Sequence, residues 1–177
     1  MGRETWVAER VREFAGLRGR RVVSWTGVEM AIREEGGDDG GPLFEDPAVA
    51  CRQLLALDAA LDDATVVNVG TYQDDAWFGL WLHRASAVSA DHTGIFRART
   101  LTDLPTGVIE EVTTVVDEGV VAEVLLHVAG RPVLLMAGEI HEDWSNPLRF
   151  ARLDESVLVF TDPADAASVD WTPDRPG

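Results

Sequence analysis

Closely spaced turns divide much of this chain into short β-rich segments. In the second half, the turns at 104–107, 117–119 and 129–131 each separate two runs rich in Val, Ile and Leu. Runs of this length joined by tight turns pair most easily with their neighbours in antiparallel order. The pattern therefore predicts strands at 108–116, 120–128 and 133–141, and an antiparallel sheet at the centre of the fold.

The first half predicts similar strands. Residues 21–33 have a β-rich composition, and the segments 65–72 and 77–83 alternate around a polar turn. The leucines and alanines of 54–61 fit a helix as well as a strand, and their context favours a strand. Near the C-terminus we expect an apolar strand at 157–160, a loop at 144–152 and a short helix at 164–168 that begins at Asp162-Pro163.

A weak internal similarity relates the two halves. At an offset of 68 residues, 65–75 lies over 133–143, and Asp74-Asp75 then meets Glu142-Asp143. The hairpins could be a structural duplication, or two ordinary hairpins that share β patterning.

The N-terminal segment 1–20 is basic and predicts a helix. Trp6, Val7, Val11 and Phe14 recur at helical spacing between Thr5 and Ala15, so this apolar face should dock on the sheet. A detachable arm for a membrane surface or a partner is the alternative. Residues 34–42 predict a mobile acidic loop and 172–177 a frayed tail. Together these features indicate one α+β domain over 1–177, mainly an antiparallel sheet, with possible duplicated hairpins and an N-terminal helix packed on it.

The charge excludes several kinds of chemistry. All 15 basic residues are arginines, against 31 acids, for a net charge of −16. Without lysine the chain can supply neither a P-loop lysine nor a Schiff base to pyridoxal phosphate. Residues 1–21 carry +3, so the rest of the chain carries −19. This field disfavours nucleic acid and favours a basic protein partner.

Cysteine and hydropathy indicate the compartment. The single cysteine, Cys51, permits no internal disulfide, and no segment approaches the ~20 apolar residues of a membrane span. We therefore expect a cytoplasmic protein that does not bind membranes.

No catalytic or cofactor motif stands out, so we expect a binding protein more than an enzyme. Glu139 and His141 share a strand face and Asp143 follows, which makes a weak divalent-cation site conceivable. No metal-binding spacing accompanies them, and an ordinary polar strand end is the preferred interpretation. We predict no cofactor, no metal and no catalytic residue, and we expect Cys51 to be a buried structural residue.

Aromatic residues beside acids mark two turns as a candidate partner-binding surface. Large rings supply anchoring area, and carboxylates steer a basic partner. A role in the core is the alternative for Trp77 and Trp144, and the acidic segment 34–39 is the next candidate surface. The predicted partner-binding residues are Tyr72, Asp74, Asp75, Trp77, His141, Glu142, Asp143 and Trp144.

Three segments, 103–107, 137–144 and 154–162, resemble small acidic bacterial proteins of the kind found among immunity proteins of polymorphic toxin systems. The resemblance implies a stoichiometric inhibitor that masks a basic toxin. It carries no diagnostic motif and transfers no functional residue. Two other functions stay open: a ligand-binding or hydrolytic domain with a sheet lined by tryptophan and carboxylates, and a structural subunit that pairs as a homodimer.

Because the sequence offers no disulfide and no metal-binding spacing, the fold should depend on neither. EDTA or a reductant should leave the thermal midpoint unchanged within error in a scanning calorimetry experiment. A drop of many degrees with EDTA would contradict this and point to the site at Glu139 and His141.

Overall fold

The computed structural model describes residues 2–85, 93–143 and 147–177. Strands dominate this part of the chain, and nearly all of them pair antiparallel, as expected. No described helix is long and apolar enough to cross a membrane. The elements are α1 (Arg3–Ala15), β1 (Arg21–Met30), β2 (Arg52–Leu61), β3 (Val66–Asp74), β4 (Trp77–Ala85), β5 (Phe96–Thr100), β6 (Gly107–Asp117), β7 (Val120–Val128), β8 (Arg131–Glu142), β9 (Leu148–Phe160), α2 (Pro163–Ala167) and β10 (Trp171–Thr172).

The strand pairings close into a ring. Going round it, the order is β1, β2, β9, β8, β7, β6 and back to β1, and every neighbouring pair is antiparallel. The β3–β4 hairpin extends the sheet from β2, β5 pairs with β1, and β10 runs parallel to β9. The closed ring surrounds a hydrophobic core. An open sheet of the same strands would have no enclosed interior.

Strand β2 changes partners along its length, and this closes the ring. The first residues of β2 pair with β9, through Arg52 to Val159 and Leu54 to Val157, whereas the later residues 57–60 pair with β3. The change coincides with a register shift against β1 at Leu55, whose side chain is exposed. A bulge of this kind bends a strand and lets its two halves serve different neighbours.

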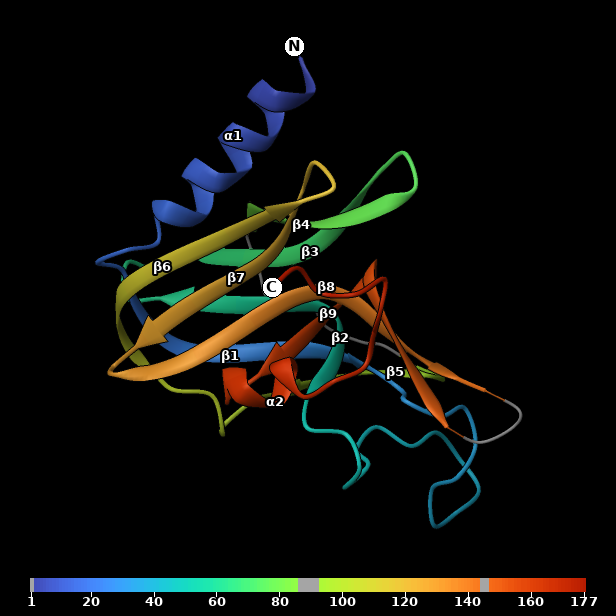
Figure 1. Ribbon diagram of the computed structural model, residues 1–177. Helices are drawn as coiled ribbons and strands as arrows, with labels where there is room; N and C mark the ends of the chain where they lie inside the picture. Colours follow the sequence, from blue (N-terminus) through green and yellow to red (C-terminus); the bar gives the residue numbers. More distant parts are fainter. Residues whose placement is uncertain (1, 86–92, 144–146) are drawn as a thin grey trace.

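The hydrophobic core lies between the strands of the ring and the β3–β4 hairpin. Trp25, Leu57, Leu80, Leu126 and Leu135 are nearly inaccessible and belong to one cluster, although they come from five different strands. Figure 1 shows β3 and β4 behind β6 and β7, and β4 lies close to both β7 and β9. The strand assignment over 54–83 is therefore confirmed, and β3–β4 forms the expected hairpin.

Helix α1 packs on the sheet through the predicted face. Val7 and Phe14 are buried, and Trp6 and Val11 pack against the core. Arginines of the N-terminal segment bind the body of the protein: Arg3 pairs with Asp74, and Arg20 pairs with Asp63. Of the two expected arrangements, a docked helix and a detachable arm, the structure contains the docked helix.

The C-terminal third differs from expectation in two places. Residues 148–152, expected to be a loop, form the beginning of the long strand β9. The sequence pattern suggests a surface position for the charged Arg152, whereas its side chain is buried. The tail 172–177, expected to be frayed, begins with Thr172 of β10, and Arg175 within it donates two hydrogen bonds to Glu123, at 2.8 and 2.6 Å. The helix start at Asp162 is confirmed, since its side chain accepts from the Ala164 N–H at 2.9 Å.

A buried ion-pair network connects β6, β7 and β9. The side chain of Arg152 is 0% exposed and pairs with Asp117, and its Nη2 atom lies 3.3 Å from Oε1 of Glu123. Glu123 also binds Arg175, so two arginines neutralise one buried carboxylate. Charges this deeply buried are tolerated only when they are paired, so each member depends on the others.

Replacing Arg152 by Met should therefore lower the free energy of unfolding by about 3–5 kcal/mol, because Asp117 and Glu123 would lose their buried partner. Urea denaturation followed by circular dichroism measures this change. Arg149→Met on the same strand is the control, since that side chain is 75% exposed, and it should cost no more than about 1 kcal/mol. Equal losses in the two variants would contradict a structural role for the network.

Candidate functional site

The first predicted group of partner-binding residues lies at the β3–β4 turn, where it holds helix α1. The rings of Tyr72 and Trp6 meet edge to face, with centroids 4.3 Å apart. Tyr72 and Trp77 both pack on a small buried cluster formed by Val120, Ala122 and Leu153. Oδ2 of Asp74 lies 2.7 Å from Nε of Arg3. Asp75 is exposed in the turn, with a positive φ of 56°.

The second group lies at the end of β8, and Trp144 falls outside the described residues. His141 Nε2 lies 3.0 Å from Oδ2 of Asp154, Glu142 Oε1 lies 3.4 Å from Nη1 of Arg33, and Asp143 pairs with Arg149 at 3.2 Å. Figure 1 shows the β3–β4 turn at the upper right and the end of β8 at the lower right. The two groups therefore occupy separate parts of the molecule.

An acidic cavity of about 690 Å³ lies beside the end of β8. Its wall combines the end of β1 and the segment after it, residues 30–35, with residues 139–143 of β8 and its end. The sequence analysis singled out residues of the second segment directly, and it named 34–39 as the next candidate surface, of which Glu34 and Glu35 line the cavity. Among the described residues that line the cavity, Arg33 is the single arginine, and the carboxylates are Glu34, Glu35, Glu139, Glu142 and Asp143.

Backbone and amide contacts fix the cavity floor. Gln53 is 2% exposed; its Oε1 accepts from the Ile140 N–H at 2.6 Å, and its Nε2 donates to the Ala31 carbonyl at 3.3 Å. The Gln53 side chain of β2 therefore connects β8 to the segment that follows β1. Sequence reasoning missed Gln53, although a glutamine at the start of an apolar run is an unusual buried polar residue.

Glu139, His141 and Asp154 form a cluster at the edge of this cavity. One possible ligand atom from each lies within 4.8 Å of the other two. Burial raises the pKa of the Glu139 carboxyl; the charge of His141 opposes this rise, and the charges of Asp154 and Glu155 add to it. Glu139 therefore occupies a site where negative charge is poorly compensated.

Asp154 reaches this cluster because β9 contains a large bulge. Gly138 pairs with Arg152 and Ala137 pairs with Val157, so residues 153–156 have no partners on β8. Leu153 has a φ of 60° yet is 2% exposed, and the Thr71 hydroxyl donates to the Glu155 carbonyl, which anchors the bulge to β3. The sequence signal for this bulge is the polar run Asp154-Glu155-Ser156, which interrupts the strand between Leu153 and Val157.

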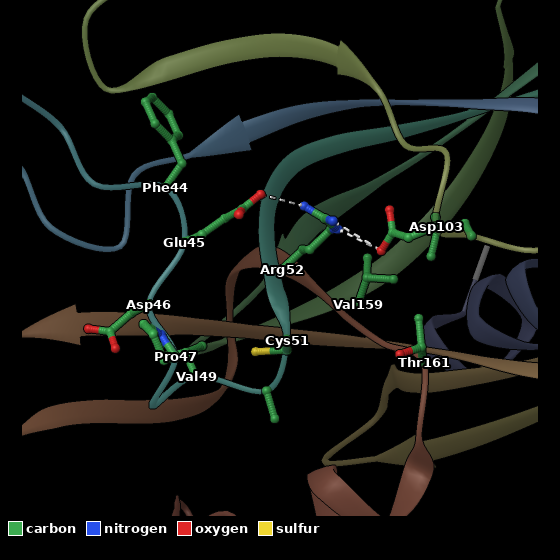
Figure 2. A pocket seen from close by; sticks show the side chains of 12 residues that line it. Phe44, Glu45, Asp46, Pro47, Val49, Cys51, Arg52, Asp103, Val159 and Thr161 are labelled. Atoms are coloured by element: carbon green, nitrogen blue, oxygen red, sulfur yellow. Dashed lines mark hydrogen bonds and ion pairs between the residues drawn. The ribbon is translucent and has the colours of Figure 1, made fainter. Parts of the chain in front are cut away.

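A second cavity, of about 540 Å³, lies beside a cluster of arginines and acids. Figure 2 shows Arg52 between Glu45 and Asp103 on its wall. The nearly inaccessible Glu29 carboxylate binds Arg52 at 2.9 Å, Arg97 at 2.5 Å and Arg99 at 3.1 Å. Three arginines thus meet three acids, so this cluster is electrically balanced and explains how β5 is held to β1 and β2. Sequence analysis identified neither β5 nor this cluster.

Cys51 also lines the second cavity. Burial raises the pKa of its thiol to about 12, with a further contribution from the charge of Asp165. Figure 2 shows its sulfur directed toward the segment that contains Pro47 and Val49. The thiolate, the nucleophilic form, is therefore strongly disfavoured, which agrees with a structural role.

A third hollow, of about 860 Å³, separates α1 from the β6–β7 turn. Its walls are mainly apolar, with Val7 and Val11 facing Val116. Among the described residues, the lining of the acidic cavity has five carboxylates and one arginine, whereas the second cavity has three and one and the third hollow has two and two. The acidic cavity therefore carries the largest excess of negative charge of the three, and we take it as the candidate functional site.

No family model, curated protein or solved structure matches this chain.

Because the Cys51 thiol ionises so reluctantly, iodoacetamide at about pH 8 should alkylate the folded protein at least a hundredfold more slowly than the urea-unfolded chain. Mass spectrometry of timed samples measures both rates. Rapid alkylation of the folded protein would show that Cys51 is an accessible and reactive thiol.

Proposed function

We propose that the protein is a protein-binding module that receives basic side chains of a partner in the acidic cavity. The observation that carries the proposal is the convergence of five carboxylates, from two segments about a hundred residues apart, on one hollow that contains a single arginine. Charges gathered in this way attract a cationic partner over several ångströms and speed its association.

The apolar part of the lining favours an arginine or lysine side chain over a small cation. Met30, Ile32, Ile95 and Ile140 line the same cavity as the carboxylates. An arginine or lysine places an aliphatic stem against such residues while its charged end meets the acids. A protein that projects basic residues from its surface therefore matches both parts of the wall.

The chain itself provides an example of this recognition. Arg33 enters the cavity wall, where its guanidinium lies 3.4 Å from Glu142 and 3.8 Å from Asp46. The Glu34 N–H donates to the other oxygen of Glu142 at 3.3 Å. Glu34, Glu35 and Asp143 lie beside this pair, so a partner's guanidinium could bind in the same manner.

A basic toxin domain is a partner of this class, and the resemblance to immunity proteins favours it within the class. Inhibition would then follow from occupying the basic surface with which the toxin holds its own acidic substrate. The surface at Tyr72, Asp74 and Trp77 is less suited to this role, because Trp6 and Arg3 of α1 already bind there.

Neutralising the cavity should weaken the binding of a basic peptide about tenfold, since each exposed ion pair contributes about 0.2–1 kcal/mol. The variant carries Glu34→Gln, Glu35→Gln, Glu142→Gln and Asp143→Asn, and the probe is a fluorescent oligo-arginine peptide at about 20 mM salt. The matched control removes four exposed carboxylates elsewhere: Asp62→Asn, Glu118→Gln, Asp170→Asn and Asp174→Asn.

Both variants change the net charge equally, so fluorescence anisotropy separates a local site from general attraction. The control should bind within about threefold of the unmodified protein. Equal weakening in the two variants would mean that the peptide senses only the overall charge, and the proposed site would be wrong.

A further inference from the structure

The geometry points to a divalent transition-metal site at Glu139, His141 and Asp154, of the class that binds Zn²⁺ through one imidazole nitrogen and two carboxylate oxygens. This inference goes beyond the proposed function and adds Asp154, although Glu139 and His141 also line the acidic cavity. It concerns the edge of the acidic cavity where β8 meets the bulge of β9.

The first support is the donor set. An imidazole with two carboxylates is a common combination for zinc and its neighbours, whereas Mg²⁺ and Ca²⁺ prefer oxygen alone. The three possible ligand atoms lie within 4.8 Å of one another. A point within about 2.8 Å of all three must then exist, and small side-chain rotations would shorten this to the ~2.0–2.2 Å of zinc bonds.

The second support is the charge around Glu139. Among the described residues, no arginine pairs with its carboxylate, and its nearest basic neighbour is the His141 ring, whose Nδ1 lies 4.0 Å from Oε1 and which is charged only when protonated. Asp154 and Glu155 add negative charge. Elsewhere in the protein the buried carboxylates Glu29 and Glu123 are each bound by two or more arginines. A bound cation would give Glu139 the compensation that arginine gives those two.

The third support is the way in which the three side chains are positioned. Glu139 and His141 are alternate residues of β8, so their side chains share a face, and Gln53 fixes the intervening Ile140. Asp154 comes from a bulge that Thr71 anchors to β3. Bulges often redirect a side chain toward a functional site, and this one directs Asp154 to the face that carries His141.

Only three protein ligands are present among the described residues, and Glu139 and His141 also line the acidic cavity. A metal ion bound there would keep at least one coordination position open, as in zinc sites that exchange water for a ligand. The open position would face the cavity, where a carboxylate or an imidazole of a partner could complete the coordination.

Isothermal titration calorimetry of EDTA-treated, buffer-exchanged protein with ZnCl₂ tests the site. We expect one ion per chain, at least tenfold weaker binding in each of His141→Gln, Glu139→Gln and Asp154→Asn, and binding of CaCl₂ at least tenfold weaker than that of ZnCl₂. His127→Gln is the matched control, because His127 is also a strand histidine beside a carboxylate, Glu111, at 3.7 Å. It should bind zinc within about twofold of the unmodified protein.

A second measurement needs no variant. In NMR spectra of the imidazole groups, zinc should shift the signals of His141 and leave those of His83 and His127 in place. No uptake at about 1 mM zinc, several equivalent ions per chain, equal binding of Ca²⁺, or an unchanged His141 signal would each show that the cluster is only a polar contact between β8 and β9.

The two proposals can fail separately. The four-carboxylate cavity variant keeps Glu139, His141 and Asp154, so it should bind zinc within about threefold of the unmodified protein while it binds the peptide about tenfold more weakly. The His141→Gln variant should do the reverse.

Discussion

The short pairing between β2 and β9 is the interaction on which the rest of the structure depends. Residues 52–54 bind residues 157–159, and this contact converts a long curved sheet into a ring with an interior. It also places Gln53 beside Ile140 on the wall of the acidic cavity, while the neighbouring Arg52 binds Glu29 of β1 in the arginine cluster. Without the pairing of β2 with β9, β2 and β8 would not line the same cavity.

Internal pairing determines which part of the negative charge is available to a partner. Buried acids such as Glu29 and Glu123 are bound by arginines, and Asp74, an expected partner-binding residue, pairs with Arg3. Arginine suits these roles because its planar group binds two oxygens at once and keeps its charge when buried. Carboxylates then most outnumber arginines around the acidic cavity, where the described lining holds five carboxylates and one arginine. The placement of the fifteen arginines among the thirty-one acids therefore determines both which ion pairs stabilise the fold and which carboxylates can meet a partner.

Local patterns predicted most strands but not the positions that depend on distant partners. The alternation in 65–72 and 77–83, the turns of the second half and the Asp162 cap each reflect residues close in sequence, and the strands and the helix start that they predict are present. The beginning of β9 was missed because Arg152 is buried by Asp117 and Glu123, which lie about thirty residues away. Strand β5 was missed because its Phe-Arg-Ala-Arg-Thr segment becomes a strand by pairing with β1 and giving two arginines to Glu29.

For the candidate site, the sequence by itself determined the ingredients: an acidic body, an acidic segment near 34–39, and a strand end with Glu139, His141, Glu142 and Asp143. Only the tertiary structure decided which of these meet. It joined the acidic segment to the end of β8, separated both from the turn at Tyr72 and Trp77, and brought Asp154 to His141 through a bulge. The reason is physical: composition and period depend on neighbouring residues, whereas ring closure and bulge position depend on strand registers between segments far apart in the chain.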